Sequence, residues 1–114
     1  PVIFTAQAVA VRLNTVLGED EESLVITSGA LGGERLRNIS QCVETVVLFK
    51  AYRNTKDIND AMEETGFLEY SMAISRCGRD KEQIITNVRD LEMMPPDYWT
   101  LVIAKKNGNG HSPI

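Results

Sequence analysis

The chain has 114 residues, a formal net charge of -4, 43% hydrophobic residues and 25% charged residues. This length suits one domain with a real core and is too short for two. The acidic balance has no basic stripe, which argues against nucleic-acid binding by phosphate neutralisation. No apolar run approaches the roughly 20 residues of a membrane-spanning helix, and no basic leader precedes one, so neither a membrane anchor nor a signal peptide is predicted.

The two cysteines, Cys42 and Cys77, have neither the spacing of a metal site nor that of a disulfide framework. We interpret both as small buried hydrophobic residues, which suits a reducing, cytoplasmic setting. The chain begins at Pro1 without an initiator Met. It is therefore expected to be a fragment of a longer protein.

An amphipathic helix is predicted for residues 4–17, because apolar residues recur there at steps of three and four. Thr5 is placed to cap its first turn, and Gly18 ends it. The acidic run at residues 19–22 lacks the alternating ligands of a calcium loop, so a solvated turn is expected. The inward-facing residues of this helix are Ala6, Val9, Ala10, Leu13, Val16 and Leu17.

A short strand is expected at residues 24–27, followed by a glycine-rich loop at 28–33. The loop lacks the Gly-Lys-Ser/Thr ending of a phosphate-binding P-loop and the spacing of a dinucleotide fingerprint. A flexible connection is therefore favoured over a phosphate site. A helical turn follows, with Leu36, Ile39 and Val43 facing inward.

The apolar run at residues 45–50 is typical of a strand buried on both faces, and we expect it to be the central strand. Asn54 or Thr55 then caps a helix. Gly66 is placed to end that helix in a left-handed conformation, with Phe67 packing back on it. The inner face of this helix is expected to carry Ile58, Ala61 and Met62.

Strands at residues 70–75 and 83–88 are separated by a short polar turn, which favours antiparallel pairing. Pro95 and Pro96 interrupt the chain before a last apolar strand at 100–105. The predicted fold is an α/β domain over residues 1–106, with a mixed, roughly five-stranded sheet and helices on its faces. Residues 107–114 are expected to form a flexible tail.

The side chains indicate no catalytic constellation. The one histidine, His111, lies in the expected tail, so a Ser-His-Asp or Cys-His mechanism has no base. One histidine and two separated cysteines do not make a closed metal site. The acids Asp57, Asp60, Glu63 and Glu64 are expected to be solvated on a helix surface.

Strand ends offer a different kind of site. Ligands of α/β sheets sit at the carboxyl ends of strands, where backbone groups lack ladder partners. Phe49, Lys50 and Gly78 stand at or just after such ends. An activated cofactor such as S-adenosylmethionine needs mainly positioning and desolvation, which backbone groups and apolar walls provide.

Several segments agree, in order, with a known family. The chain resembles the C-terminal domain of the tetrapyrrole methylases, the S-adenosylmethionine-dependent enzymes of cobalamin and sirohaem synthesis. The resemblance covers nearly the whole chain except the tail. The segments are Ile3-Phe-Thr-Ala6 with the helix after it, Glu44-Thr-Val-Val-Leu-Phe-Lys50, Gly66, Gly78 with Gln83, and Tyr98-Trp-Thr-Leu-Val-Ile-Ala-Lys105.

The resemblance implies a set of cofactor contacts: Thr5, Ala6, Phe49, Lys50, Cys77 and Gly78. Ordinary structural roles remain open for several of them. Thr5 also suits a helix cap, Phe49 a core position and Gly78 a turn. The family usually has Met where Phe49 stands, so only a backbone contact carries over there without change.

The resemblance also implies an activity for a two-domain parent. Within the family, the Arg-Leu-Asn helix end and the Arg-Cys-Gly turn most resemble the branch that methylates carbon 20 of precorrin-2 or its cobalt-containing analogue. The partners implied are a tetrapyrrole substrate, the missing N-terminal domain and a second copy in a homodimer. The alternatives are uroporphyrinogen-III methylation, RNA ribose methylation, which the acidic balance disfavours, and a non-catalytic dimerisation domain. Candidate partners for the macrocycle's carboxylates are Arg12, Arg53 and Arg76.

Overall fold

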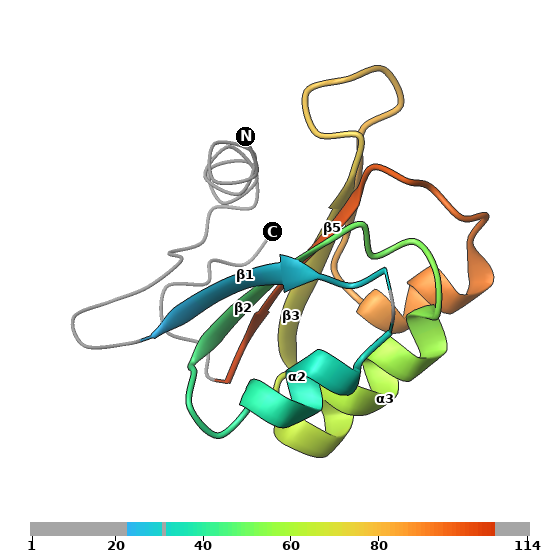
Figure 1. Cartoon of the computed structure of the whole chain (residues 1–114). Helices are drawn as coiled ribbons and strands as arrows, with labels where there is room; N and C mark the ends of the chain where they lie inside the picture. The colour runs from blue at the N-terminus through green and yellow to red at the C-terminus, as the bar shows by residue number, and fades with distance from the viewer. Residues whose placement is uncertain (1–22, 31, 107–114) are drawn as a thin grey trace.

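The computed structural model describes residues 23–30 and 32–106, which form one five-stranded sheet with helices packed against it (Figure 1). β1 is parallel to β2, and every other pair of neighbours is antiparallel. The sheet is therefore mixed, as predicted. The strands, in the spatial order β1-β2-β5-β3-β4, are β1 (Leu24–Ser28), β2 (Thr45–Phe49), β5 (Thr100–Lys105), β3 (Tyr70–Ser75) and β4 (Gln83–Ile85).

The middle of the sheet is β5, so the expectation that residues 45–50 form the central strand was wrong. β2 lies second, between β1 and β5. Every residue of β5 is buried, and four of the five residues of β2 are buried. A continuous apolar run indicates burial on both faces, but this property is shared by both strands and does not tell them apart.

The described helices all cover one face of the sheet, and a sheet flanked by helices is as predicted. They are α2 (Glu34–Ile39), α3 (Thr55–Thr65) and the 3-10 helix η1 (Val88–Met93). Their apolar side chains form one core with the alternate strand residues that point toward them. This core includes Leu36, Val46, Leu48, Ile58, Met62, Phe67, Ala73, Val88 and Val102.

The opposite face of the sheet is apolar as well. Its side chains come from the other set of alternating positions, as the pleat of a strand requires. Val47 pairs with Ile103 across β2 and β5, and Ile103 pairs with Met72 across β5 and β3. These residues form a second core cluster with Ile74 and Leu101.

Helix α3 ends as predicted. Gly66 adopts a left-handed conformation with φ 86°, and its N–H donates to the Glu63 carbonyl. The Phe67 N–H donates to the Met62 carbonyl at 2.8 Å, and the Phe67 ring is fully buried. The predicted start was wrong in one respect, because Asn54 has φ 54° and its side chain makes no capping bond.

The strand predicted over 83–88 is shorter than expected. β4 ends at Ile85, and Val88 already belongs to η1. Asn87 explains the change, since its side chain accepts a hydrogen bond from the Arg89 N–H and caps the 3-10 helix. An apolar pattern carries no sign of such a local side-chain bond.

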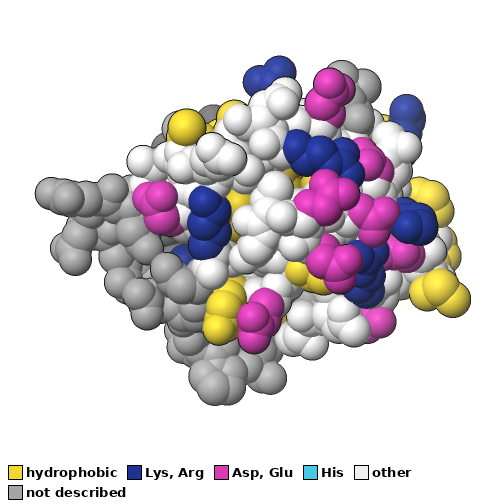
Figure 2. Space-filling view, turned by 90° about the horizontal axis from the view of Figure 1, so that it is seen from below, with side chains coloured by type: hydrophobic (Ala, Val, Ile, Leu, Met, Phe, Trp, Pro, Cys, Tyr) yellow, Lys and Arg dark blue, Asp and Glu magenta, His cyan; other side chains and the backbone are white. Residues whose placement is uncertain are grey.

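The acids on α3 form ion pairs with neighbouring elements instead of standing alone in solvent. Asp57 pairs with Arg37 of α2 at 2.9 Å. Asp60 pairs with Arg89 of η1 at 2.9 Å and with Lys56. Figure 2 views the molecule from below and shows Lys and Arg side chains interleaved with Asp and Glu. These carboxylates therefore link the helices to one another.

The glycine-rich loop packs tightly against α3. The Gly33 N–H, the first backbone donor of α2, is bonded to the Asp57 carboxylate at 2.8 Å. A Cβ at Gly33 would overlap the Ala61 Cβ and lie 2.8 Å from the Asp57 carbonyl oxygen. Glycine is required here because the loop backbone touches the helix backbone directly.

We expect Gly33→Ala to lower the free energy of unfolding by about 3 kcal/mol, because backbone must move to admit the methyl group. The control is Gly66→Ala, where a Cβ has nothing within 4 Å and only the left-handed φ is strained. That change should cost about 1–2 kcal/mol. Urea unfolding of both variants checks the order, and an equal or smaller loss for Gly33→Ala would contradict the packing described.

Two predicted regions, the helix at 4–17 and the tail at 107–114, lie outside the described residues. The domain boundary at residue 106 stays a prediction. Within the described part of the chain, no helix is long and apolar enough to cross a membrane.

Candidate functional site at the strand ends

The carboxyl ends of β1, β2 and β3 lie along one edge of the sheet, together with the start of β5. Ser28 is paired with Phe49, and Phe49 with Leu101. Ser75 is paired with Thr100 on the other side of β5. The structure thus brings four predicted site residues to this edge. They are Phe49, Lys50, Cys77 and Gly78, whereas Thr5 and Ala6 lie outside the described residues.

β2 and β3, the two strands that flank β5, end in the same unusual way. Lys50 directly follows β2 with φ 55°, and Arg76 directly follows β3 with φ 57°. A left-handed conformation costs a residue with a side chain about 1–2 kcal/mol. Strain of this kind persists only where the surroundings fix it, and it gathers at ligand sites.

Hydrogen bonds to the start of β5 fix both turns. The Ala51 N–H donates to the Thr100 carbonyl at 3.0 Å, and the Arg76 N–H donates to the Trp99 carbonyl at 3.2 Å. β5 lies between β2 and β3, so the two loops leave the sheet on opposite sides of its first residues. The turns at Lys50 and Arg76 therefore lie on the two sides of the Trp99–Thr100 backbone.

The backbone groups predicted to contact a cofactor already have internal partners. The Phe49 carbonyl accepts from the Gly29 N–H at 2.8 Å. The Gly78 N–H donates to the Glu82 carboxylate at 2.7 Å, in a loop where Gly78 itself has φ 74°. A ligand acceptor at Gly78 would have to displace that carboxylate. The space beside Gly78 is open, since a Cβ there would have nothing within 4 Å.

Asp97 organises this edge and was missed by the sequence reasoning. Its carboxylate accepts from the Trp99 N–H at 3.0 Å and from Arg76 Nε at 2.8 Å. Its carbonyl accepts from both the N–H and the hydroxyl of Thr100. The available signal was an Asp after Pro95-Pro96 and just before a strand, the pattern of an Asx turn. Arg76, a candidate for substrate carboxylates, is engaged by Asp97.

The pKa of Asp97 lies below its ordinary value of 3.8. The main cause is the Trp99 N–H, which stabilises the carboxylate, and the Arg76 side chain adds to it against partial burial. A carboxyl group whose pKa is lowered by folding stabilises the protein at neutral pH. That contribution is lost as the pH falls through the lowered pKa.

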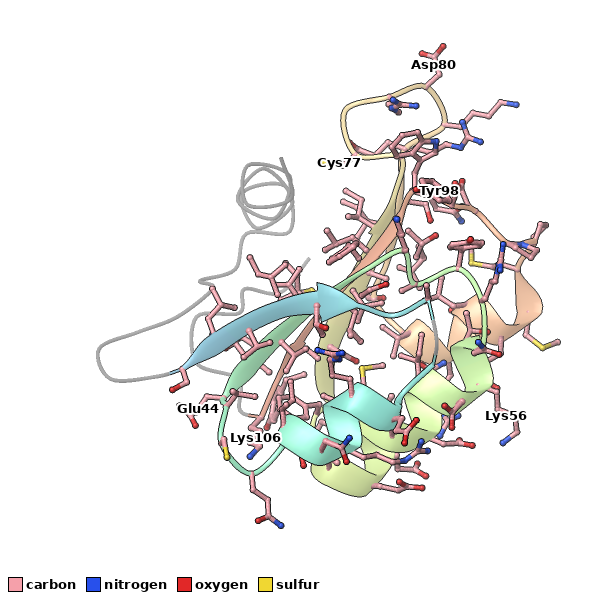
Figure 3. All side chains as sticks on the ribbon, viewed as in Figure 1. Glu44, Lys56, Cys77, Asp80, Tyr98 and Lys106 are labelled. Atoms are coloured by element: carbon pink, nitrogen blue, oxygen red, sulfur yellow. The ribbon has the colours of Figure 1, made fainter. Side chains whose placement is uncertain are left out.

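Three aromatic rings from two separate segments meet at this edge. The ring centroids of Tyr52 and Tyr98 are 5.3 Å apart, and those of Tyr98 and Trp99 are also 5.3 Å apart, edge to face. Tyr98 is 47% exposed and Trp99 is 48% exposed. Figure 3 shows Tyr98 near the base of the loop that carries Cys77 and Asp80. The sequence places Tyr52 far from the other two, so this cluster was not predicted.

A cavity of about 630 Å³ lies beside β1, the outermost strand on one side of the sheet, and beside α2. Phe49 is the predicted site residue that contributes to its wall. Gly78 and the three rings of Tyr52, Tyr98 and Trp99 do not line it. The lining residues are Ile26, Thr27, Ser28, Gly32, Glu34, Arg35, Asn38, Ile39 and Phe49.

Cys77 and Cys42 are both unbridged thiols. Cys42 is exposed, so its interpretation as a buried hydrophobic residue was wrong. Cys77 is partly buried and packs near the second core cluster, beneath the turn at Gly78. Over residues 23–30 and 32–106, no group of three or more His, Cys, Asp or Glu could hold a metal ion.

Comparison with solved structures finds this architecture in several methyltransferases. The chain superimposes on cobalt precorrin-4 methyltransferase, a cobalamin biosynthetic enzyme, with a TM-score of 0.68 and 17% identity over 89% of its own length. It matches uroporphyrin-III C-methyltransferase from Thermus thermophilus, complexed with S-adenosylhomocysteine, with a TM-score of 0.60 and 15% identity over 88%. It matches the methyltransferase CobJ with a TM-score of 0.59 and 19% identity over 88%. The chain has their fold.

The chain spans about half of each of these proteins, namely 48%, 49% and 46% of their lengths. Diphthine synthase shares the fold as well, with a TM-score of 0.55 and 13% identity. No family model and no curated protein matches the sequence.

We expect Asp97→Asn to lower the free energy of unfolding by about 1–2 kcal/mol at pH 7, because the Arg76 guanidinium loses its charged partner. The difference from the unsubstituted protein should shrink as the pH falls below about 4, since Asp97 takes up a proton first in the unfolded state and, at lower pH, in the folded state as well. Urea unfolding at pH 7 and pH 3 measures both values.

The matched control is Asp80→Asn, which makes the same charge change at the tip of the 76–82 loop (Figure 3). An exposed tip residue should change stability by less than about 0.5 kcal/mol. If both variants lose the same stability, or if the Asp97→Asn loss persists in acid, the anchoring role of Asp97 is wrong.

Proposed function

We propose that this chain is the cofactor-binding half of an S-adenosylmethionine-dependent methyltransferase that acts on a tetrapyrrole. The observation that carries the proposal is the pair of left-handed residues, Lys50 and Arg76, at the ends of the two strands that flank β5. It is supported by a fold shared with methyltransferases of cobalamin and porphyrin chemistry, one of them complexed with S-adenosylhomocysteine.

The residues at the edge fit such a cofactor. Lys50 and Gly78 have left-handed backbone conformations, and Gly78 leaves open space for close approach. Phe49 and Cys77 supply apolar wall beside them. In the proposal, Thr5 and Ala6 complete the contacts from the preceding segment. Donors and acceptors on a rigid backbone orient a ligand without rotamer cost, which suits a reaction that needs alignment.

When bound, S-adenosylmethionine supplies an activated methyl group on a sulfonium, so the protein needs no nucleophile of its own. The chain's contribution is to fix the cofactor's orientation, to exclude water and to leave the methyl facing the substrate. The attacking carbon belongs to the macrocycle.

The full proposal assigns the parent to methylation of carbon 20 of precorrin-2 or its cobalt-containing analogue, in the cytoplasm. It includes an N-terminal domain supplied by the same protein and pairing into a homodimer. Methylation of uroporphyrinogen III is the second candidate, favoured by the likeness to uroporphyrin-III C-methyltransferase. The two differ in the substrate and share the cofactor site.

The deciding assay uses the full-length protein that contains this chain, with S-adenosylmethionine carrying a labelled methyl group. Precorrin-2 and uroporphyrinogen III are offered separately. Transfer to precorrin-2 alone supports carbon-20 methylation, and transfer to uroporphyrinogen III alone supports the second candidate. Transfer to neither, with no calorimetric binding of S-adenosylhomocysteine, would leave a non-catalytic interaction domain.

We expect Gly78→Val to weaken S-adenosylhomocysteine binding by about tenfold or more, because a branched side chain would fill the space beside the strand end. Gly66→Val is the matched control. Gly66 has the same left-handed backbone and the same open surroundings, but it lies at the end of α3. Calorimetry on both full-length variants should show loss for Gly78→Val only. Equal affinities would place the cofactor elsewhere.

A further inference from the structure

Beside the proposed cofactor contacts lies a surface that they do not use. We call it the aromatic–cationic surface and define it by six residues. They are the rings Tyr52, Tyr98 and Trp99 and the cations Lys50, Arg53 and Arg79. Lys50 belongs to it through its side chain, whereas the proposed cofactor contact uses its backbone.

Each ring carries one cation. The Arg79 guanidinium lies 3.9 Å from the Trp99 ring centroid, and that of Arg53 lies 4.8 Å from the centroid of Tyr52. Lys50 Nζ lies 5.6 Å from the Tyr98 ring centroid. Cation–π attraction of this kind is worth about 0.5–1 kcal/mol at an exposed site. This attraction holds the three positive side chains against the three aromatic rings.

These cations differ from the other paired cations of the described chain. Arg37, Arg89 and Lys56 form ion pairs between or within the helices, and Arg76 is paired with Asp97. Lys50, Arg53 and Arg79 lie over rings instead and keep their full charge toward solvent. Asp97 and Glu82, two acids near this surface, are already bonded to Arg76 and to the Gly78 N–H, and Asp80 lies at the tip of the 76–82 loop.

The surface is therefore positive within a chain whose net charge is -4. It also exposes about half of two large aromatic side chains. A ligand that suits it has a broad apolar face for the rings and several anionic groups at its margin for the cations. A phosphate polymer would need a wider basic area than three cations provide.

We propose that the aromatic–cationic surface binds the face and the peripheral carboxylates of the tetrapyrrole substrate. This inference rests on the proposed function and adds the substrate-gripping residues to it. Trp99 lies at the start of β5, between the turned residues Lys50 and Arg76. A macrocycle stacked there would lie next to the proposed cofactor contacts. Arg53 and Arg79 would act as positioning residues for its carboxylates.

The test measures binding of uroporphyrin III to the full-length protein by the shift of the porphyrin absorption band. The double variant Arg53→Gln/Arg79→Gln should bind it about tenfold or more weakly, because two charge-assisted contacts are lost. Trp99→Leu should weaken binding by about fivefold or more, since a stacking partner is removed. Lys56→Gln removes one positive charge on α3, where Lys56 is paired with Asp60, and should bind as the unsubstituted protein does.

Two further measurements separate this inference from the proposed function. S-adenosylhomocysteine affinity should be the same in the double variant and the unsubstituted protein, whereas Gly78→Val tests the cofactor site alone. Coproporphyrin III, with the same ring and fewer carboxylates, should lose less affinity in the double variant than uroporphyrin III does. Unchanged uroporphyrin affinity in the double variant, or no porphyrin binding at all, would overturn the inference even where the cofactor binds. Binding of ATP in place of porphyrin through Trp99 would overturn it too and would indicate a nucleotide surface.

Discussion

The docking of the first residues of β5 between β2 and β3 is the constraint on which the candidate site depends. Backbone bonds from Ala51 and Arg76 hold this point from both sides, and Asp97 closes it with four further hydrogen bonds. Both bonds are made just beyond the last residues of β2 and β3, where the chain turns on either side of β5. The left-handed conformations of Lys50 and Arg76 are the local cost of that docking.

The parts of the fold that could be predicted are those decided by local chemistry. Gly66 ends α3 because a left-handed residue without Cβ satisfies the last helix carbonyls, and that signal lies within a few residues of sequence. β3 and β5 have the predicted bounds because their apolar runs are delimited by polar turns and prolines. The order of the strands in the sheet could not be predicted, since β2 and β5 are both buried on two faces and their sequences do not indicate which strand each one pairs with.

The candidate site shows the same division. The rule that ligands lie at strand ends was enough to bring Phe49, Lys50 and Gly78 together in the prediction. Asp97 and the aromatic–cationic surface were missed because they depend on contacts between segments far apart in the sequence, such as Tyr52 with Tyr98. The Glu82 bond to Gly78 was missed for another reason. A loop carboxylate can reach a nearby N–H only in one of many loop conformations.

Backbone and side chains have separate tasks under the proposals. A cofactor held by turned backbone requires certain φ angles and open space, and it places little demand on side-chain identity. This is compatible with a fold shared at TM-scores of 0.59–0.68 with methyltransferases only 15–19% identical to the chain. The rings and cations beside that backbone are then free to change with the substrate. Tyr98 and Trp99 connect the proposed cofactor site with the aromatic–cationic surface. The hydrogen bonds that fix the turns at Lys50 and Arg76 also fix where these rings lie.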